Sequence, residues 1–202
     1  MREFDLVVLG GGNAVTVAMA AGRRGWKAAV IEEGPLGGVC PNRGCIPSKL
    51  LLGYADVASV VRDAGRFHID ARIDALAGPA LLAETFGATR RTDARIAANL
   101  GENVTLLRGR GRFVGERTFE VNGERLRGAR AIVATGGRPA VPDVPGLAGT
   151  PYWTSRDVFE MESLPASIVI VGGGYVGCEL AQFFHGVGVE TTVVQRGDGL
   201  LQ

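Results

Sequence analysis

The chain has 202 residues, a formal net charge of +1, 46% hydrophobic residues and 31 glycines. This apolar content is sufficient for a packed core, and the near-zero charge gives no electrostatic reason to expect binding to nucleic acid. The longest run without a charged residue, 6–22, has 17 residues and is interrupted by glycines, whereas a membrane span needs about 20. The first residues lack a signal-peptide pattern, so we expect a soluble cytoplasmic protein that does not cross a membrane.

Two segments share the order strand, glycine turn, helix, strand, which is the start of a parallel α/β unit. The ranges of the first segment are 4–9, 10–12, 14–22 and 28–31. The ranges of the second segment are 168–171, 172–174, 175–186 and 191–194. The sequence therefore predicts a distant internal repeat of two mononucleotide-binding units.

The region between the repeats contains two predicted helices and four short strands. The helices are 58–62 and 79–100, and the strands are 104–107, 111–114, 118–121 and 131–134. Asn122 and Gly123 favour a tight turn, which predicts an antiparallel ribbon around them. The proline-rich stretch 138–151 is the best candidate for a linker.

The second glycine turn, 172–177, matches G-x-G-x-x-G between a strand and a helix. Gly172 allows the tight turn, Gly174 lets the backbone approach a pyrophosphate, and Gly177 lets the helix pack closely on the strand. The free N–H groups and the helix dipole then bind phosphates. The alternative is a tight turn without a ligand.

The first glycine turn is less regular, because Gly10 and Gly12 fit the motif but position 15 is valine. Either Ala14 takes the role of the third glycine, or Val15 takes it and the helix packs slightly farther away. Glu32 lies 20 residues after Gly12, where an acid can bind both ribose hydroxyls, although an exposed strand-end carboxylate is the alternative.

The second unit has Gln195 and Arg196 at the place that corresponds to Glu32. The acid is absent, and Arg196 could pair with a 2′-phosphate, which favours NADPH over NADH. The alternative is an ordinary surface arginine beyond a strand.

These elements predict an α/β fold. We expect a Rossmann-like FAD/NAD(P)-binding domain over residues 1–145, in three layers with a parallel sheet and an antiparallel ribbon. An incomplete second Rossmann-like unit would follow over residues 146–202. A doubly wound sheet needs about five or six strands, so we expect the chain to be a fragment or a truncated product of a longer protein.

Cys40 and Cys45 are five residues apart, a spacing that in a cytosolic protein indicates redox or metal chemistry. No nearby residues complete four metal ligands, so no metal site is expected, and buried inert thiols are the remaining alternative. Five residues of ideal helix separate two Cα atoms by about 8.5 Å, more than the roughly 7 Å that a disulfide allows. Pro41 and Gly44 let the segment deform, and a helix beginning near Cys45 would favour its thiolate.

The segment 37–49, GGVCPNRGCIPSK, resembles the active-site motif of the FAD-dependent pyridine nucleotide–disulfide oxidoreductases. The resemblance covers the whole chain and about the first two fifths of a typical member, and the order of motifs agrees, including ATGGRP at 134–139. It implies an oxidoreductase of cell redox homeostasis that binds FAD and NAD(P)H. Electrons would pass between these cofactors, the Cys40–Cys45 pair, and a small disulfide, a dithiol or a soft metal. Full-length members form homodimers.

The resemblance also implies roles for individual residues. Cys40 would be the interchange thiol that attacks the substrate, and Cys45 would be the thiol beside the flavin. Lys49 would stabilise negative charge on the reduced ring, and Glu179 would pair with this lysine. Tyr175 would be the aromatic gate over the nicotinamide site. The alternative for Lys49 and Glu179 is an ordinary surface ion pair, and the alternative for Tyr175 is a tyrosine of the core.

Further flavin contacts are implied for Gly38 at the pyrophosphate and for the backbone of Gly111 on the adenine side. Thr135 and Gly136 resemble the strand end near FAD. Arg43 departs from the apolar residue that members often have, and it would bind an anionic substrate, raise the potential of the disulfide, or point to solvent.

The family's acid–base histidine belongs to a C-terminal dimerisation domain of the partner subunit, so neither His68 nor His185 is assigned this role. We therefore expect this chain alone to lack full disulfide reductase turnover. The alternative function is a truncated, catalytically incomplete module that binds FAD or another nucleotide.

Overall fold

The computed structural model describes residues 1–201, which pack as two compact units. Unit 1 comprises residues 1–42 and 90–138, and unit 2 comprises residues 43–89 and 139–201. These units are defined by packing, so the domain boundary predicted after residue 145 stays a prediction.

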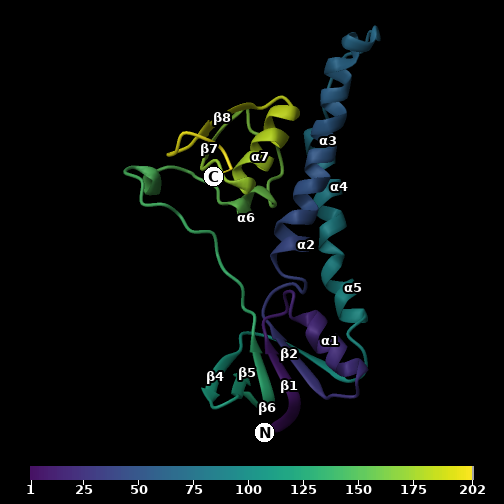
Figure 1. Ribbon diagram of the computed structural model, residues 1–202, viewed down its shortest axis with the longest axis vertical. Coiled ribbons are helices and arrows are strands. Elements are labelled where there is room, and N and C mark those ends of the chain that lie inside the picture. The colour runs from purple at the N-terminus through teal and green to yellow at the C-terminus, as the bar shows by residue number, and fades with distance from the viewer. Residues whose placement is uncertain (202) are drawn as a thin grey trace. The chain divides into compact units, whose positions relative to one another are not determined.

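Unit 1 is built on a six-stranded sheet with the order β3-β2-β1-β6-β5-β4 (Figure 1). The strands are β1 (Arg2–Leu9), β2 (Ala28–Glu32), β3 (Val104–Arg108), β4 (Arg112–Gly115), β5 (Thr118–Val121) and β6 (Glu124–Val133). β1 pairs in parallel with β2 and β6, and β2 pairs in parallel with β3, whereas β4, β5 and β6 are antiparallel. The predicted α/β fold, with its parallel sheet and antiparallel ribbon, is confirmed.

Strands β1 and β2 of unit 1 are buried on both faces, because their side chains alternate between two apolar clusters. Leu6 and Val8 of β1 pack with Ala18 of α1 (Val15–Arg23) on one face. Val7 and Leu9 pack on the other face with β5 of the ribbon. Asn122 and Gly123 both have positive φ, which is the geometry of a tight two-residue hairpin turn, so the ribbon turns where the sequence predicts it.

Helices dominate unit 2, where one apolar cluster joins α3 (Cys45–Asp63), α4 (Gly78–Arg90) and α7 (Tyr175–Gly186). Figure 1 shows α3 and α4 running side by side. Short helices complete the chain, namely α2 (Val39–Arg43), η1 (Ala64–Phe67), α5 (Thr92–Ala98), η2 (Leu147–Gly149) and α6 (Ser155–Val158).

Two predicted helices differ from the observed ones. α3 begins 13 residues before the predicted start at residue 58. The helix includes Pro47 without losing a hydrogen bond, because Pro47 lies in the first turn, where no backbone N–H is needed for the helix. The helix predicted over residues 79–100 divides into α4 and α5, with Arg91 between them.

The second strand–turn–helix–strand segment is formed by β7 (Ser167–Val171), α7 and β8 (Glu190–Val194). β7 and β8 pair in parallel, and Ile168 and Ile170 pack on the apolar cluster of unit 2. The alternate side chains Val169, Val171 and Val194 are exposed. The predicted internal repeat is therefore present in the fold.

One helical segment of the described residues, Val39–Phe67, is long and apolar enough to cross a membrane by length and composition alone. A mostly buried core helix of a soluble protein meets the same test; here 28% of the most apolar 18-residue window is buried, and Leu51, Ala55 and Ala58 are buried residues of the segment. The expectation that the chain does not cross a membrane stays a prediction.

Candidate dinucleotide-binding turns and redox segment

The first glycine turn follows β1 and is held by backbone hydrogen bonds. The N–H of Gly10 donates to the carbonyl of Ile31 over 2.8 Å, and the N–H of Gly11 donates to the Glu32 carboxylate over 2.5 Å. The second carboxylate oxygen of Glu32 accepts the N–H of Gly34 over 2.7 Å. Glu32 therefore closes the turn from the end of β2, and the binding of ribose hydroxyls expected of it stays a prediction.

The second glycine turn repeats these contacts in unit 2. The N–H of Gly172 donates to the carbonyl of Val194 over 2.8 Å, and the N–H of Gly173 donates to the side-chain oxygen of Gln195 over 2.9 Å. A methyl group on Gly11 would meet Leu36, and a methyl group on Gly173 would meet Leu200, each at 2.5 Å. The two turns therefore share one construction.

Four glycines of these turns fall into two groups when a Cβ atom is added to each. A Cβ atom at Gly10 would overlap the carbonyl oxygen of Ala134, and one at Gly177 would overlap the carbonyl oxygen of Gly172. These glycines are required by the fold, because no real Cβ atom approaches a backbone oxygen so closely. Gly177 thus packs α7 against the start of its own turn, as the motif predicts.

Gly12 and Gly174, the second glycines of the G-x-G-x-x-G motif, are different, because a Cβ atom would not be crowded there. The nearest atom to it would be 3.7 Å away at Gly12, and no atom would lie within 4 Å at Gly174. Neither residue has a positive φ, so nothing in the packing of the chain requires glycine at these two positions. Each leaves an open cradle beside free N–H groups, which fits the backbone approach of a pyrophosphate.

The first turn has Val15 where the motif has its third glycine, and the structure shows how Ala14 and Val15 are placed. The N–H of Val15 donates to Gly12 and that of Val17 donates to Ala14, so a tight turn precedes α1. Val15 is the first residue of α1 and is buried in the apolar cluster, whereas Ala14 precedes the helix and is half-buried.

Other predicted flavin contacts lie around the first turn. Gly38 has φ +70 and a Cβ atom on it would be 3.0 Å from the Cα of Gly12, so the two backbones face each other closely. Gly111 packs on Leu9 and Ile31, which by itself requires glycine there. Thr135 and Gly136 follow β6 and are exposed, and neither is in contact with the turn through any hydrogen bond described within residues 1–201.

Asp93 and Arg108 hold the loop beside the first turn by hydrogen bonds, an arrangement that we call the clamp and that sequence reasoning missed. The Asp93 carboxylate of α5 accepts the N–H of Leu36 over 2.7 Å and two hydrogen bonds from Arg108, whose guanidinium also donates to the carbonyl of Gly34. Burial raises the pKa of Asp93, but the Leu36 N–H and the Arg108 guanidinium outweigh it and hold the pKa below its usual range. The clamp fixes the loop that carries Gly38.

The two cysteines lie on consecutive helices. Cys40 is in α2 and is half-buried, and Cys45 is the exposed first residue of α3. Gly44 separates the helices with backbone angles of φ −155 and ψ −118, which are not helical and so interrupt the helical path.

Lys49 and Glu179 meet between α3 and α7 within unit 2. The Nζ atom of Lys49 donates to one oxygen of the Glu179 carboxylate over 2.6 Å, and the Ser48 hydroxyl donates to the other over 2.9 Å. The Lys49 ammonium holds the pKa of Glu179 below its usual range, against the opposing effect of burial, and Ser48 adds to this lowering. Ser48 is only 7% exposed and was not singled out by the sequence.

The predicted nicotinamide residues line an apolar groove of about 870 Å³ in unit 2. Its lining includes Gly172, Gly174, Tyr175 and Gly177. Tyr175 is the first residue of α7 and is 75% exposed, so it is not a core tyrosine. Arg196 is exposed, two residues beyond the end of β8.

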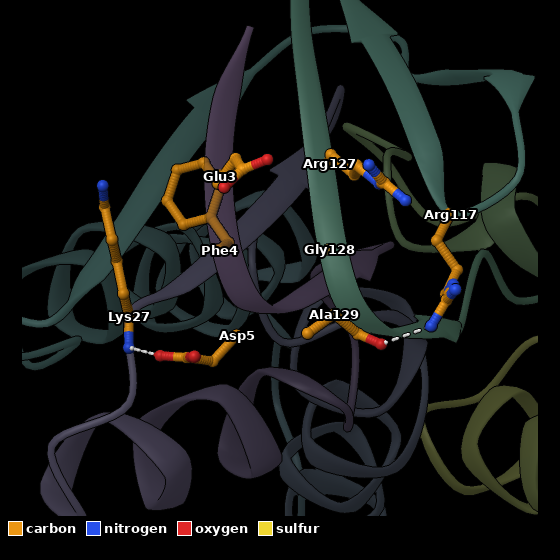
Figure 2. A pocket seen from close by; sticks show the side chains of 8 residues that line it. All are labelled: Glu3, Phe4, Asp5, Lys27, Arg117, Arg127, Gly128 and Ala129. Carbon is orange, nitrogen blue, oxygen red and sulfur yellow. Dashed lines mark hydrogen bonds between the residues drawn. The ribbon is translucent and has the colours of Figure 1, made fainter.

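A second pocket, of about 380 Å³, opens in unit 1 where β1 begins, and contains none of the predicted site residues. Figure 2 shows Lys27 and Asp5 at one side of it and the Arg117 and Arg127 side chains at the other. The backbone N–H of Lys27 donates to Asp5 over 2.8 Å, and Arg117 donates to the carbonyl of Ala129 over 3.0 Å (Figure 2). The pocket is therefore lined by both acidic and basic groups, namely Glu3, Asp5, Lys27, Arg117 and Arg127.

The fold and these sites define an α/β protein that has two glycine turns of the dinucleotide-binding type and, between them in the sequence, a pair of cysteines. A family model described as pyridine nucleotide–disulphide oxidoreductase matches residues 4–202. The chain belongs to this family, which consists of flavoprotein oxidoreductases whose members use FAD and NAD(P)H.

The similar proteins agree with this assignment. The chain is 32% identical to a mercuric reductase of Staphylococcus aureus, over 99% of this chain and 37% of that protein. It is 36% identical to a dihydrolipoyl dehydrogenase of Bacillus subtilis, over 98% of this chain and 45% of that protein. It also matches the flavoprotein disulfide reductase RclA of Escherichia coli, solved as a Cu(II) complex of a mutant form, with a TM-score of 0.85 and 25% identity over 100% of this chain and 44% of that one. The chain spans about two fifths of the length of these relatives.

Proposed function

We propose that the chain carries the dinucleotide turns and redox cysteines of an FAD-dependent NAD(P)H disulfide oxidoreductase. The observation that carries this proposal is the pair of open cradles at Gly12 and Gly174, where packing does not require glycine but a pyrophosphate does. The same position in two repeated turns is open in the same way. One cradle for FAD and one for NAD(P)H account for both.

FAD would be held by the Gly10–Gly12 turn, by Gly38 and by Glu32, and it would supply a ring that exchanges electrons with thiols. One oxygen of Glu32 accepts the N–H of Gly11 from the turn and the other accepts the N–H of Gly34, so the carboxylate is fixed at the end of β2 and its remaining lone pairs can accept ribose hydroxyls. The clamp by Asp93 keeps the loop of Gly38 in place around the same turn.

The cysteine pair would act on the substrate by thiol–disulfide exchange. The Cys40 thiolate attacks one sulfur of a substrate disulfide, so that a mixed disulfide forms and one substrate thiolate leaves. The Cys45 thiolate then attacks the Cys40 sulfur, which forms the Cys40–Cys45 disulfide and releases the second substrate thiolate. Each leaving thiolate takes one proton, and the two electrons that reduce the substrate come from the cysteine pair.

Lys49 and Glu179 form the charged pair of this site. The carboxylate is fixed by Ser48 and Lys49 together, so the ammonium has a defined position on α3 one helical turn after Cys45. We assign Lys49 to the stabilisation of negative charge beside the flavin, the role that the family resemblance implies.

The second cradle would take NADPH in preference to NADH. Gln195 occupies the place of the acid and uses its side-chain oxygen to accept the Gly173 N–H, which leaves its amide N–H groups as donors. A donor and the Arg196 cation suit a 2′-phosphate, whereas an acid suits free ribose hydroxyls. We therefore expect tighter binding of NADPH than of NADH.

The substrate class is a small disulfide, a dithiol or a soft metal ion. Relatives named mercuric reductase and dihydrolipoyl dehydrogenase support both kinds of substrate. Thiolates bind soft metals and exchange with disulfides through the same sulfur atoms, so one cysteine pair serves either reaction.

FAD titration of the chain, followed by flavin absorbance and by filtration to separate bound cofactor, tests the first cradle. Gly12→Ala fits the turn without crowding, so it should fold normally but bind FAD at least about tenfold more weakly, because its methyl group occupies the place of the pyrophosphate. Gly87→Ala is the matched control, since its methyl group also meets nothing within 4 Å.

Three outcomes are decisive. Loss of FAD from Gly12→Ala alone supports the proposal. No binding of FAD by the unaltered chain contradicts it. Binding of FAD without any exchange of electrons with the cysteines supports the alternative of a nucleotide-binding module without turnover.

A further inference from the structure

Arg43, the last residue of α2, lies between the two cysteines in the sequence, and its side chain forms an ion pair in unit 2. One guanidinium nitrogen of Arg43 is 2.9 Å from a carboxylate oxygen of Glu160. The Arg43 side chain is 33% exposed, so the arginine is partly covered and does not simply point to solvent. This pair is separate from the pair of Lys49 and Glu179.

The position of Glu160 is set by its neighbours in the chain. Phe159 and Met161 are both buried in the apolar cluster of unit 2, and the ring of Phe159 meets Phe86 edge to face at 6.5 Å. The preceding helix, α6, begins with a capping box between Thr154 and Asp157. The backbone of Glu160 is thus anchored on both sides, whereas its side chain is 61% exposed, so the ion pair with Arg43 is partly solvated.

The charge of Arg43 bears on the cysteines because of its place in the chain. Cys40 precedes it by three positions and Cys45 follows it by two. A nearby cation favours thiolate over thiol and so favours the reduced dithiol over the disulfide. A carboxylate that pairs with this cation reduces that effect.

We propose that Glu160 is a positioning residue that holds Arg43 and thereby sets the reduction equilibrium of the Cys40–Cys45 pair. The inference rests on the proposed function, in which these cysteines form a redox disulfide. Because the effect acts through charge, removal of the carboxylate and removal of the guanidinium must shift the equilibrium in opposite directions. A purely structural latch would respond to both removals in the same direction.

The test is equilibration of the full chain with mixtures of reduced and oxidised glutathione. The Cys40–Cys45 disulfide and two glutathione thiols exchange into two protein thiols and one glutathione disulfide. One S–S bond breaks and another forms, two electrons pass to the protein, and two protons follow them. Acid quenching, thiol alkylation and peptide mass spectrometry give the ratio of dithiol to disulfide at these two cysteines.

Glu160→Gln should move the equilibrium toward the dithiol by about threefold, and Arg43→Gln should move it toward the disulfide by about threefold, as expected for one charge within about 10 Å in a partly solvated site. The double variant should lie between the two. Glu162→Gln, a change of an exposed glutamate two residues away, should leave the equilibrium unchanged.

The inference is overturned if both single variants shift the equilibrium equally in the same direction, or if neither shifts it. The proposed function is kept in that case, provided that the unaltered chain forms the Cys40–Cys45 disulfide. An unaltered chain in which Cys40 and Cys45 form no disulfide with oxidised glutathione overturns the proposed function and the inference together. Opposite shifts that the Glu162→Gln control lacks support the inference.

Discussion

Gly186, the last residue of α7, offers a quantitative test of how α7 packs against α3. A methyl group added there would lie 2.5 Å from the Cβ of Ala55 and 3.1 Å from its Cα. Both neighbouring atoms are fixed to the α3 backbone, so neither can rotate away. Gly186→Ala must therefore separate the two helices or distort them.

Two opposing effects determine the size of this change. Alanine is favoured over glycine in a helix by about 1 kcal/mol. An extra methyl group in a packed contact costs about 1–3 kcal/mol. The carbonyl of Gly186 also accepts a 2.7 Å hydrogen bond from Arg62 of α3, which a separation of the helices would weaken. We expect a net loss of about 1–2 kcal/mol in the free energy of unfolding.

Urea unfolding, followed by circular dichroism and by tryptophan fluorescence, measures this loss. The chain has one tryptophan in each unit, Trp26 and Trp153, so a Trp26→Phe background reports unit 2 alone. Gly53→Ala in α3, where a methyl group meets nothing within 4 Å, is the control and should gain about 0.5–1 kcal/mol.

A compensating variant makes the argument specific to the contact. Ala55→Gly combined with Gly186→Ala moves the methyl group from one helix to the other and should recover most of the stability lost in Gly186→Ala. The reasoning is refuted if Gly186→Ala is as stable as the unaltered chain, or if the double variant is no more stable than Gly186→Ala.

Three further predictions concern the sites. Lys49→Met should raise the pKa of Glu179 toward its ordinary value, seen by carboxyl NMR titration. Lys49 lowers the pKa of Glu179 in the folded state, so the ion pair stabilises the fold by about 0.5 kcal/mol for an exposed lysine. This stabilisation is complete above the unfolded pKa of 4.5 and is lost as the pH falls through the folded pKa. A loss of stability in Lys49→Met that persists in acid contradicts this. Gly177→Ala should cost about 3 kcal/mol through its clash with Gly172, whereas Gly174→Ala should leave thermal stability unchanged, and equal effects would be inconsistent with the observed turn. Asp93→Asn should cost about 1–2 kcal/mol and speed hydrogen exchange at the Leu36 amide, with unchanged exchange counting against the clamp.

The sequence predicts those parts of the site whose signals are local. Gly10, Gly12 and Glu32 follow from the spacing of a strand, a turn and a second strand. The extent of α3 could not be obtained in this way, because Pro47 and Gly53 interrupt the apolar pattern while the packing of unit 2 stabilises the helix across them.

The missed residues have partners that are distant in the sequence. Asp93 accepts its backbone hydrogen bond from a residue 57 positions away, and Ser48 donates to a carboxylate 131 positions away. Aspartate and serine are common on protein surfaces, and no local pattern marks either one. The pairing of Lys49 with Glu179 was expected only from the family resemblance, since no spacing rule connects two helices so far apart.

The two glycine turns are equivalent at some positions, so a substitution measured at one of these forecasts its effect at the other. Gly11 and Gly173, Glu32 and Gln195, and Leu36 and Leu200 are equivalent pairs, and each turn closes with an N–H bond of 2.8 Å, donated by Gly37 in one and by Leu201 in the other. This last pair differs in residue type, because Leu201 adopts a φ of +60 where its counterpart is a glycine. A glycine introduced at position 201 would give that position the residue type that its positive φ favours. The forecast does not extend to Gly10 and Gly172, because a Cβ atom would clash with Ala134 at Gly10 and would meet nothing within 4 Å at Gly172.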